Sequence, residues 1–166
     1  MLGKPSFGRP SMLAPMTQTP PRQCAAVLLT NERGEVLLVR QAYGGQFWGL
    51  PGGIVDPGET PLGAAVREAR EEVGVEVALG GVVGAYLLQG GGWPDIQAYV
   101  FVGRVVSGAP TLAAPQELSA LAWCPLDGWP SPLLPDARAA LDDLRAGRTG
   151  VVRTVQRHMS LHGVPL

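Results

Sequence analysis

The chain is poor in charge, in aromatic side chains and in cysteine. Only 2 of its 166 residues are cysteine and 6% are aromatic, which excludes a scaffold stapled by several disulfides. Lys and Arg total 13 against 14 for Asp and Glu, and this balance excludes the strongly basic surface typical of nucleic-acid binding. No apolar run reaches the ~20 residues that a membrane span needs. We therefore predict a cytoplasmic protein with neither a nucleic-acid nor a membrane partner.

The N-terminal end lacks the apolar patterning of the rest of the chain. Residues 1–21 are rich in Pro, Ser and Met and contain no apolar segment of the kind a signal peptide needs. This composition predicts a disordered tail. Met1, Met12 and Met16 are all possible starts, because patterned sequence begins only at Gln23.

One domain of ordinary size, large enough for a real core, is predicted over 22–147. The segment 148–166 is predicted to be a C-terminal tail or helix. It carries Arg148, Arg153 and Arg157 and no acidic residue. A solvated tail is favoured there over an arm that binds phosphate.

Apolar runs separated by turn residues predict a series of strands. Residues 24–30 and 35–40 flank the turn sequence Asn31-Glu32-Arg33-Gly34, which predicts a β-hairpin. The glycine-containing run 75–89 predicts a bent strand. Two further strands are predicted over 96–106 and 120–124.

A C-terminal helix and two buried thiols complete the predicted core. Apolar residues recur at helical spacing near the end of the predicted domain, which indicates a helix that packs over the sheet. They are Leu133, Ala137, Ala140, Leu141 and Leu144. Cys24 and Cys124 lie in apolar strand-like runs, where a buried free thiol is the expected state.

A helix over 61–73 is predicted from both of its ends. Thr60 is a good N-cap, Pro61 suits the first helical position, and Gly74 suits a left-handed C-terminal residue. Apolar residues form one stripe along the helix, which is predicted to face the core. They are Leu62, Val66, Ala69 and Val73.

Three acidic residues cluster on another face of this helix. Glu68, Glu71 and Glu72 are spaced i, i+3 and i+4, so their charges repel, and the helix dipole disfavours anions in these last turns. Arg67 can pair with Glu71, but one cation leaves two acids uncompensated. A solvated helix surface is the simpler alternative, but it would favour Lys or Arg here. An all-oxygen cluster of this kind suits Mg²⁺, with Mn²⁺ as a substitute.

The region around these acids resembles the signature of the Nudix hydrolases. That signature is Gly, five residues, Glu, seven residues, Arg-Glu, an aliphatic, any residue, Glu-Glu, any residue, Gly and an aliphatic. It is matched at the right spacing by Gly53, Glu59, Arg67, Glu68, Glu71, Glu72, Gly74 and Val75. Ala69, small but apolar, is the one soft departure. The resemblance implies an α/β (α+β) fold, an α/β/α sandwich with a mixed sheet and a catalytic loop-helix-loop.

The resemblance also implies roles for individual residues. Divalent metal would be bound by Glu68, Glu71, Glu72 and the backbone carbonyl of Gly53. Arg67 would orient the acids and Glu59 would anchor the loop. The glycines Gly52, Gly58 and Gly74 belong to the structural part of the motif, where they permit turns and close approach of the backbone.

The activity implied is Mg²⁺-dependent hydrolysis of a nucleoside diphosphate derivative, such as a nucleoside triphosphate, an oxidised nucleotide or an ADP-ribose-like compound. Water would attack one phosphorus in line, with Glu68 or Glu117 as the base. The predicted catalytic residues are Glu68, Glu71, Arg67 and Glu117. Alternatives from other classes are a nucleotide-sensing module without turnover and an isomerase of isoprenoid diphosphates.

The substrate itself is left open by the sequence. Arg40, Trp48 and Trp93 are candidate substrate-binding residues, Arg40 for a diphosphate and the tryptophans for stacking on a base. Tyr43 and Tyr86 are further stacking candidates. Arg40 could equally close a surface ion pair, and Trp48 is better suited to packing. Family members are often dimers, so a homodimer is possible.

Overall fold

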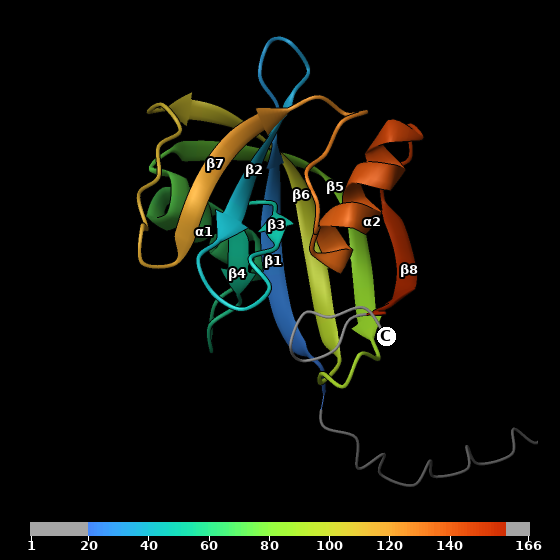
Figure 1. Ribbon diagram of the computed structural model, residues 1–166. Helices are drawn as coiled ribbons and strands as arrows, with labels where there is room; N and C mark the ends of the chain where they lie inside the picture. The colour runs from blue at the N-terminus through green and yellow to red at the C-terminus, as the bar shows by residue number, and fades with distance from the viewer. Residues whose placement is uncertain (1–19, 159–166) are drawn as a thin grey trace, which may run out of the picture.

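The computed structural model describes residues 20–158, which fold into eight strands and two helices (Figure 1). In chain order these are β1 (Arg22–Leu29), β2 (Val36–Gln41), β3 (Trp48–Gly49), β4 (Gly52–Ile54), α1 (Pro61–Val73), β5 (Glu76–Gln89), β6 (Ile96–Ser107), β7 (Leu118–Cys124), α2 (Pro135–Arg145) and β8 (Val151–Gln156). The predicted tail over 1–21 lies outside the described residues except for its last two positions. The three candidate start methionines lie wholly outside them.

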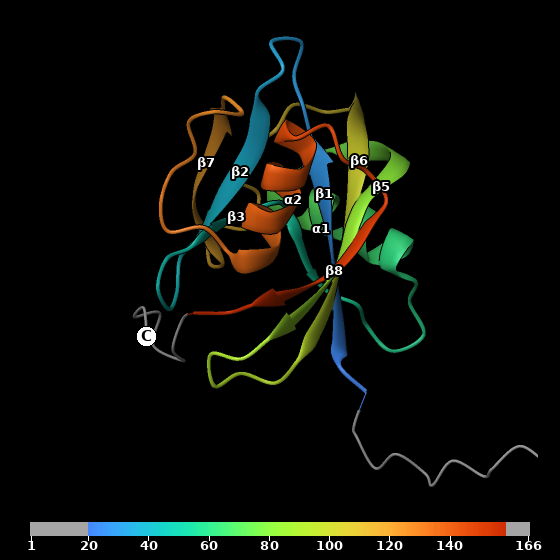
Figure 2. The same cartoon turned by 90° about the vertical axis from the view of Figure 1, so that its right-hand side faces the viewer.

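Two sheets lie between the two helices. The five-stranded sheet has the order β4-β1-β6-β5-β8 and is mixed, because β1 runs parallel to β6 and antiparallel to β4. The second sheet, β3-β2-β7, is antiparallel. The helices pack on opposite faces of this arrangement (Figures 1 and 2). The predicted α/β/α sandwich with a mixed sheet is confirmed.

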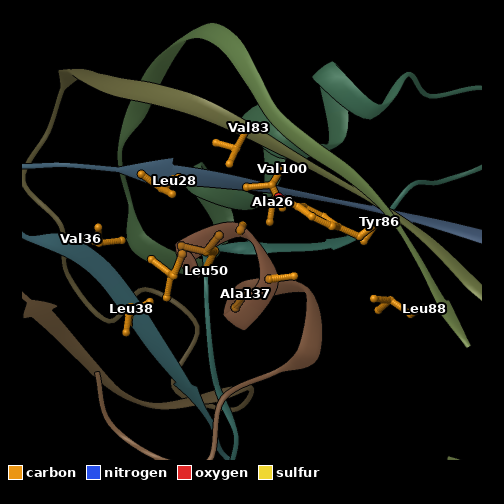
Figure 3. Packing of buried hydrophobic residues seen from close by; sticks show 14 of the residues in the cluster. Ala26, Leu28, Val36, Leu38, Leu50, Val83, Tyr86, Leu88, Val100 and Ala137 are labelled. Atoms are coloured by element: carbon orange, nitrogen blue, oxygen red, sulfur yellow. The ribbon is translucent and has the colours of Figure 1, made fainter. Parts of the chain in front are cut away.

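Strand β1 is buried on both faces, and this places the core on both sides of it. Ala26 and Leu28 point into the cluster that α2 covers (Figure 3), whereas Val27 and Leu29 point into the cluster that α1 covers. Successive side chains of a strand point to opposite faces, so a continuously apolar strand must be covered twice. The apolar run that begins at Cys24 therefore determines the layering.

The predicted hairpin of the first two strands is wrong. A tight turn does join them, with the Asn31 N–H donating to the Glu35 carbonyl at 3.0 Å. Beyond a single bridge between Thr30 and Val36, however, β1 and β2 belong to different sheets. Both edges of β1 are occupied by β4 and β6, so β2 pairs with β3 and β7 instead.

The predicted ends of α1 are confirmed. The Thr60 hydroxyl accepts a hydrogen bond from the Gly63 N–H, Pro61 opens the helix, and Gly74 ends it with φ of 70°. The predicted core stripe is wrong at one position, because Leu62 in the first turn is 51% exposed. The contact with the sheet is made further along, by small residues whose size lets the helix lie close to β1. The buried alanines are Ala64, Ala65 and Ala69.

The bent strand predicted over 75–89 is confirmed as β5. Its pairing with β6 shifts register at three places, two of them within the glycine-containing stretch from Leu79 to Gly84. The two short strands β3 and β4 were not predicted from the sequence. They occupy the stretch between the 41–47 loop and the acidic helix, and β4 carries both glycines of the Gly52-Gly53 pair.

The prediction of a C-terminal tail or helix over 148–166 is wrong for Val151–Gln156. This segment is β8, which pairs in parallel with β5 and closes one edge of the larger sheet (Figure 2). Two arginines of the predicted tail, although partly exposed, pair with an acidic residue of the domain. Arg148 and Arg153 both donate to the fully buried Asp143 carboxylate of α2, at 2.8 and 3.2 Å. The domain therefore extends beyond residue 147, and residues 159–166 lie outside the described part.

Tyr86 belongs to the same buried network, so its prediction as a base-stacking residue is wrong. The ring is fully buried in the core (Figure 3), and its hydroxyl donates to Asp143 at 2.9 Å. Burial alone would raise the pKa of Asp143, but the bonds from Arg148 and Tyr86 and the charge of Arg153 lower it below its ordinary value. Asp143 thus joins β5, α2 and β8 through a charged hydrogen-bond network.

We expect Asp143→Asn to lower the free energy of unfolding by about 2 kcal/mol at pH 7, because hydrogen bonds to a buried charge are lost. A depressed carboxylate pKa stabilises the fold above the unfolded value of about 3.9, and this contribution disappears as the pH falls through the folded pKa. Urea unfolding should therefore show the difference from wild type shrinking below about pH 4.

The matched control is Asp142→Asn, which removes only surface pairs with Arg138 and Arg145. Such pairs contribute about 0–1 kcal/mol, so this variant should stay near wild type. A difference for Asp143→Asn that is unchanged between about pH 7 and pH 3 would contradict the buried-charge explanation.

Candidate active site

The Gly52-Gly53 pair of β4 lies between β1 and the acidic face of α1. A side chain on Gly52 would collide with the backbone of Ala25 and Ala26, because β4 is paired closely with β1. A side chain on Gly53 would instead collide with the Glu68 carboxylate. The pair therefore brings bare backbone against the acids, as its sequence predicts.

Arg67 organises this part of the site with its whole guanidinium group. Nε and Nη2 donate to the two Glu59 carboxylate oxygens at 3.0 and 3.1 Å, and Nη2 also donates to the Ile54 carbonyl at 3.0 Å. Nη1 donates to Glu68 at 2.8 Å and to Glu71 at 3.1 Å. All five N–H groups of an arginine are thus used, and together they tie the loop before the helix to the acids on it.

The opposite end of this network is Glu59. Hydrogen bonds from Arg67, and then one from the Asp56 N–H, hold the pKa of the Glu59 carboxyl below its ordinary value. The Glu59 N–H donates back to the Asp56 carbonyl at 3.0 Å, which closes the turn. Gly58 has φ of 84° within that turn, a left-handed conformation that favours glycine. The loop is therefore fixed by the residues that the signature singles out.

The three clustered acids are buried to different depths. Glu72 is only 7% exposed and accepts a hydrogen bond from the Gly52 N–H at 2.9 Å. The Glu68 side chain is 12% exposed, and that of Glu71 is 58% exposed. The acids thus form a row that runs from solvent into the protein beside β4.

The two inner acids, Glu72 and Glu68, are costly to ionise where they lie. The pKa of Glu72 is raised to about 8, chiefly by burial and also by the charges of Glu68 and Glu117, against the lowering effect of a hydrogen bond from the Gly52 N–H. Burial also raises the pKa of Glu68, even though Arg67 opposes that shift. A cation next to both carboxylates would favour their ionised forms.

The donor set fits a hard divalent cation that keeps part of its water shell. Within residues 20–158, no three Asp, Glu, His or Cys side chains form a ready-made metal cage. Glu68 and Glu71 lie against Arg67 instead, and Glu72 lies against the Gly52 N–H. A magnesium site needs only one or two protein carboxylates besides waters and substrate oxygens, so the row of acids meets that requirement.

Glu117 lies near the acids, as predicted. It precedes β7 on an exposed loop, and its carbonyl accepts a hydrogen bond from the Ala42 N–H at 2.8 Å. A small cavity of about 40 Å³ has Glu72, Glu117 and Tyr43 in its walls. The end of β2 and the loop before β7 therefore bring a fourth carboxylate to the site.

A larger cavity of about 360 Å³ adjoins the acids. It shares Gly52 and Tyr43 with the small cavity, and most of its wall is apolar. Trp93 from the 90–95 loop is well exposed and lines this cavity together with Phe47. Cys24, a free thiol, also faces it.

Two predicted substrate-binding residues are not among those that line either cavity. Trp48 lies in β3, packs on the core cluster beneath α2, and exchanges backbone hydrogen bonds with Pro132 and Leu134 at 2.8 Å each. Arg40 at the end of β2 donates to the Gln46 side chain at 2.7 Å. Arg40 therefore supports the 41–47 loop.

Two polar residues of the large cavity were missed from the sequence. Asp136 lies in the first turn of α2, and burial raises the pKa of its carboxyl against hydrogen bonds from its own N–H and that of Ala137. Arg157 follows β8 directly. An acidic residue in the first turn is common in any helix, so Asp136 does not indicate a binding site. No motif surrounds Arg157 in the sequence, so it does not indicate one either.

Comparison with known proteins places this geometry in a family. Residues 20–144 match the NUDIX domain. The chain belongs to the NUDIX family. The Nudix box predicted from Gly53 to Val75 therefore corresponds to the glycine pair, the Arg67 network and the row of acids.

Two curated relatives and one solved structure illustrate the similarity. The chain is 35% identical to a putative 8-oxo-dGTP diphosphatase of Bacillus subtilis, over 81% of this chain and 87% of the relative. It is 42% identical to an RNA pyrophosphohydrolase of Erythrobacter litoralis, over 37% of this chain and 39% of that protein. A MutT NUDIX hydrolase of Burkholderia pseudomallei aligns with a TM-score of 0.71 at 29% identity, covering 76% of this chain and 99% of its own.

The protein is a Nudix hydrolase, and its relatives are named as diphosphatases and pyrophosphohydrolases. Such hydrolases generally use divalent metal ions, which agrees with the all-oxygen donor set described above. As for membranes, neither α1 nor α2, the helices of residues 20–158, is long and apolar enough to span one.

The two neighbouring glycines offer a matched pair of variants. We expect Gly52→Ala to lower the free energy of unfolding by about 2–3 kcal/mol, because its methyl group meets fixed backbone of β1. The methyl group of Gly53→Ala would meet only the end of the Glu68 side chain, which can turn away. This variant should therefore lose less than about 1 kcal/mol of unfolding free energy. Urea unfolding of both variants tests this difference, and equal losses would contradict it.

Proposed function

We propose that this Nudix hydrolase cleaves the phosphoanhydride of a nucleoside triphosphate, ordinary or oxidised, with Mg²⁺ as cofactor and Mn²⁺ as a substitute. The observation that carries the proposal is the row of unbalanced carboxylates directly beside a cavity of about 360 Å³ with aromatic walls. A nucleotide could place its phosphate chain at the carboxylates and its base in the cavity. The 8-oxo-dGTP diphosphatase relative supports this substrate class.

The metal would be held by Glu68, Glu71, Glu72 and the backbone carbonyl of Gly53. Bound there, it would neutralise phosphate oxygens and make water a stronger nucleophile. Arg67 is proposed as a positioning residue, since its bonds hold Glu68 and Glu71 on the same side of α1. Glu59 keeps Arg67 in place and so acts one step further from the reaction.

The base is proposed to be Glu117 or Glu68. One Glu68 oxygen is already occupied by a charged hydrogen bond from Arg67, which holds that carboxylate in place although burial raises its pKa. The Glu117 carboxylate, on an exposed loop, has no such bond to another described residue, and Glu117 lines the small cavity together with Glu72. These observations favour Glu117, whose loop position lets it approach a water near the acids.

The decisive experiment combines a substrate panel with the Glu72→Gln variant. With Mg²⁺ we expect hydrolysis of nucleoside triphosphates, tested beside 8-oxo-dGTP, ADP-ribose, dinucleoside polyphosphates and NADH. Glu72→Gln should lower kcat/KM by about 100-fold or more. Because it removes a buried carboxyl that is costly to ionise, it should leave the melting temperature of the metal-free protein unchanged or higher.

Glu76→Gln is the matched control, since Glu76 is exposed and pairs with Arg70 away from the cavities. It should retain wild-type activity. Failure of every panel member with both Mg²⁺ and Mn²⁺ would overturn the proposal, and tight binding without product would indicate a sensing module. Wild-type rates in Glu72→Gln would overturn the assignment of the acids.

Arg67→Lys tests the positioning role. Lysine keeps the charge but has three donors for acceptors that now use five. We expect kcat to fall by about 10- to 100-fold and the Mn²⁺ dissociation constant to rise, as measured by calorimetry. Arg70→Lys, on the same helix, should change neither, and equal effects of the two variants would contradict the role of Arg67.

A further inference from the structure

Tyr43 lies on the loop between β2 and β3, and the backbone around it is fixed by neighbouring segments. The Gln41 N–H donates to the Phe47 carbonyl at 2.9 Å, which joins the two ends of the loop. The Ala42 N–H donates to the Glu117 carbonyl at 2.8 Å. The loop is thus attached both to β3 and to the segment that carries the fourth carboxylate of the site.

The side chain of Tyr43 stands where the two cavities meet. The residues that line both cavities are Gln41, Tyr43, Leu50, Gly52 and Leu134, and the first two alone have polar side chains. Tyr43 is 60% exposed, so a ligand can reach it. A nucleotide with its base in the large cavity and its phosphate chain at the acids would cross this junction with its first phosphate.

The Tyr43 hydroxyl still has its proton to donate. Gln41 Nε2 donates to the phenol oxygen at 3.3 Å, so this bond uses the hydroxyl only as an acceptor, and the hydroxyl donates to no acceptor within residues 20–158. Burial raises the pKa of Tyr43, and the charges of Glu72 and Glu117 add to the shift against the bond from Gln41. The hydroxyl is therefore a neutral donor close to the acids.

We propose that the Tyr43 hydroxyl donates a hydrogen bond to the substrate phosphate that is attached to the nucleoside. The presence of a phosphate chain at the acids rests on the proposed function. A hydrogen bond to a charged phosphate oxygen is stronger than one between neutral groups. A further arginine at this place would pair with the carboxylates, whereas a phenol can contact the phosphate and leave them to the metal. This role differs from the stacking role that the sequence predicts for the ring.

The nucleotide dGMP and its nucleoside deoxyguanosine are suitable probes, because they differ by one phosphate and neither contains a phosphoanhydride to cleave. With Mg²⁺, we expect Tyr43→Phe to weaken dGMP binding about 10-fold in calorimetric or NMR titrations. Deoxyguanosine binding should change by less than about 2-fold, since the variant keeps the ring. The kcat/KM for the best nucleoside triphosphate of the panel should also fall about 10-fold.

Tyr99→Phe is the matched control, because Tyr99 lies on β6 and lines neither cavity. It should change neither affinity nor kcat/KM. The melting temperature of Tyr43→Phe should stay near that of the wild type, since the hydroxyl it removes lies on an exposed residue.

Other roles of Tyr43 would give different results. A ring that only stacks on the base would leave dGMP binding unchanged in Tyr43→Phe, and a structural role would weaken dGMP and deoxyguanosine equally. Either result overturns the inference, as does wild-type protein that binds dGMP no more tightly than deoxyguanosine. Selective loss of dGMP binding without hydrolysis of any triphosphate would overturn the proposed function alone. Hydrolysis that Tyr43→Phe leaves at wild-type rates, with unchanged dGMP affinity, would overturn this inference alone.

Discussion

The acidic site depends on one arginine that is shared among several acceptors. Without Arg67, Glu68 and Glu71 would repel each other on the last turns of α1, and the loop after β4 would lose its attachment through Glu59 and Ile54. A single guanidinium donates to both Glu68 and Glu71, while Glu72 relies on one backbone N–H. The site is held together well enough to fold and yet remains short of positive charge.

The two-sided burial of β1 explains where that site lies. Because β1 is covered by α1 on one face and by α2 on the other, β4 at its edge lies beside both the acids of α1 and the cavity at the start of α2. The glycine pair forms the boundary between these two regions. β4 thus separates the row of acids from most of the wall of the large cavity.

The parts of this arrangement that depend on local sequence could be predicted, and the parts that depend on distant partners could not. The ends of α1 follow from Thr60 and Gly74, which act on their own neighbours. The strands that pair with β1 cannot be predicted in this way, because one apolar strand can pair with any other apolar strand. Arg153 resembles a tail residue until Asp143 is brought next to it by folding. Asp136 and Arg157 meet the same cavity from segments that share no sequence pattern.

Strand β8 also sets an order of assembly during synthesis. Chains emerge N-terminus first, so the acidic helix and the glycine pair are available to fold long before Arg157 leaves the ribosome. The parallel pairing of β8 with β5 can form only after α2 has crossed the sheet. The cavity wall to which Arg157 contributes is therefore completed after the glycine pair and α1, so a nascent chain holds its acidic residues before the cavity beside them is closed.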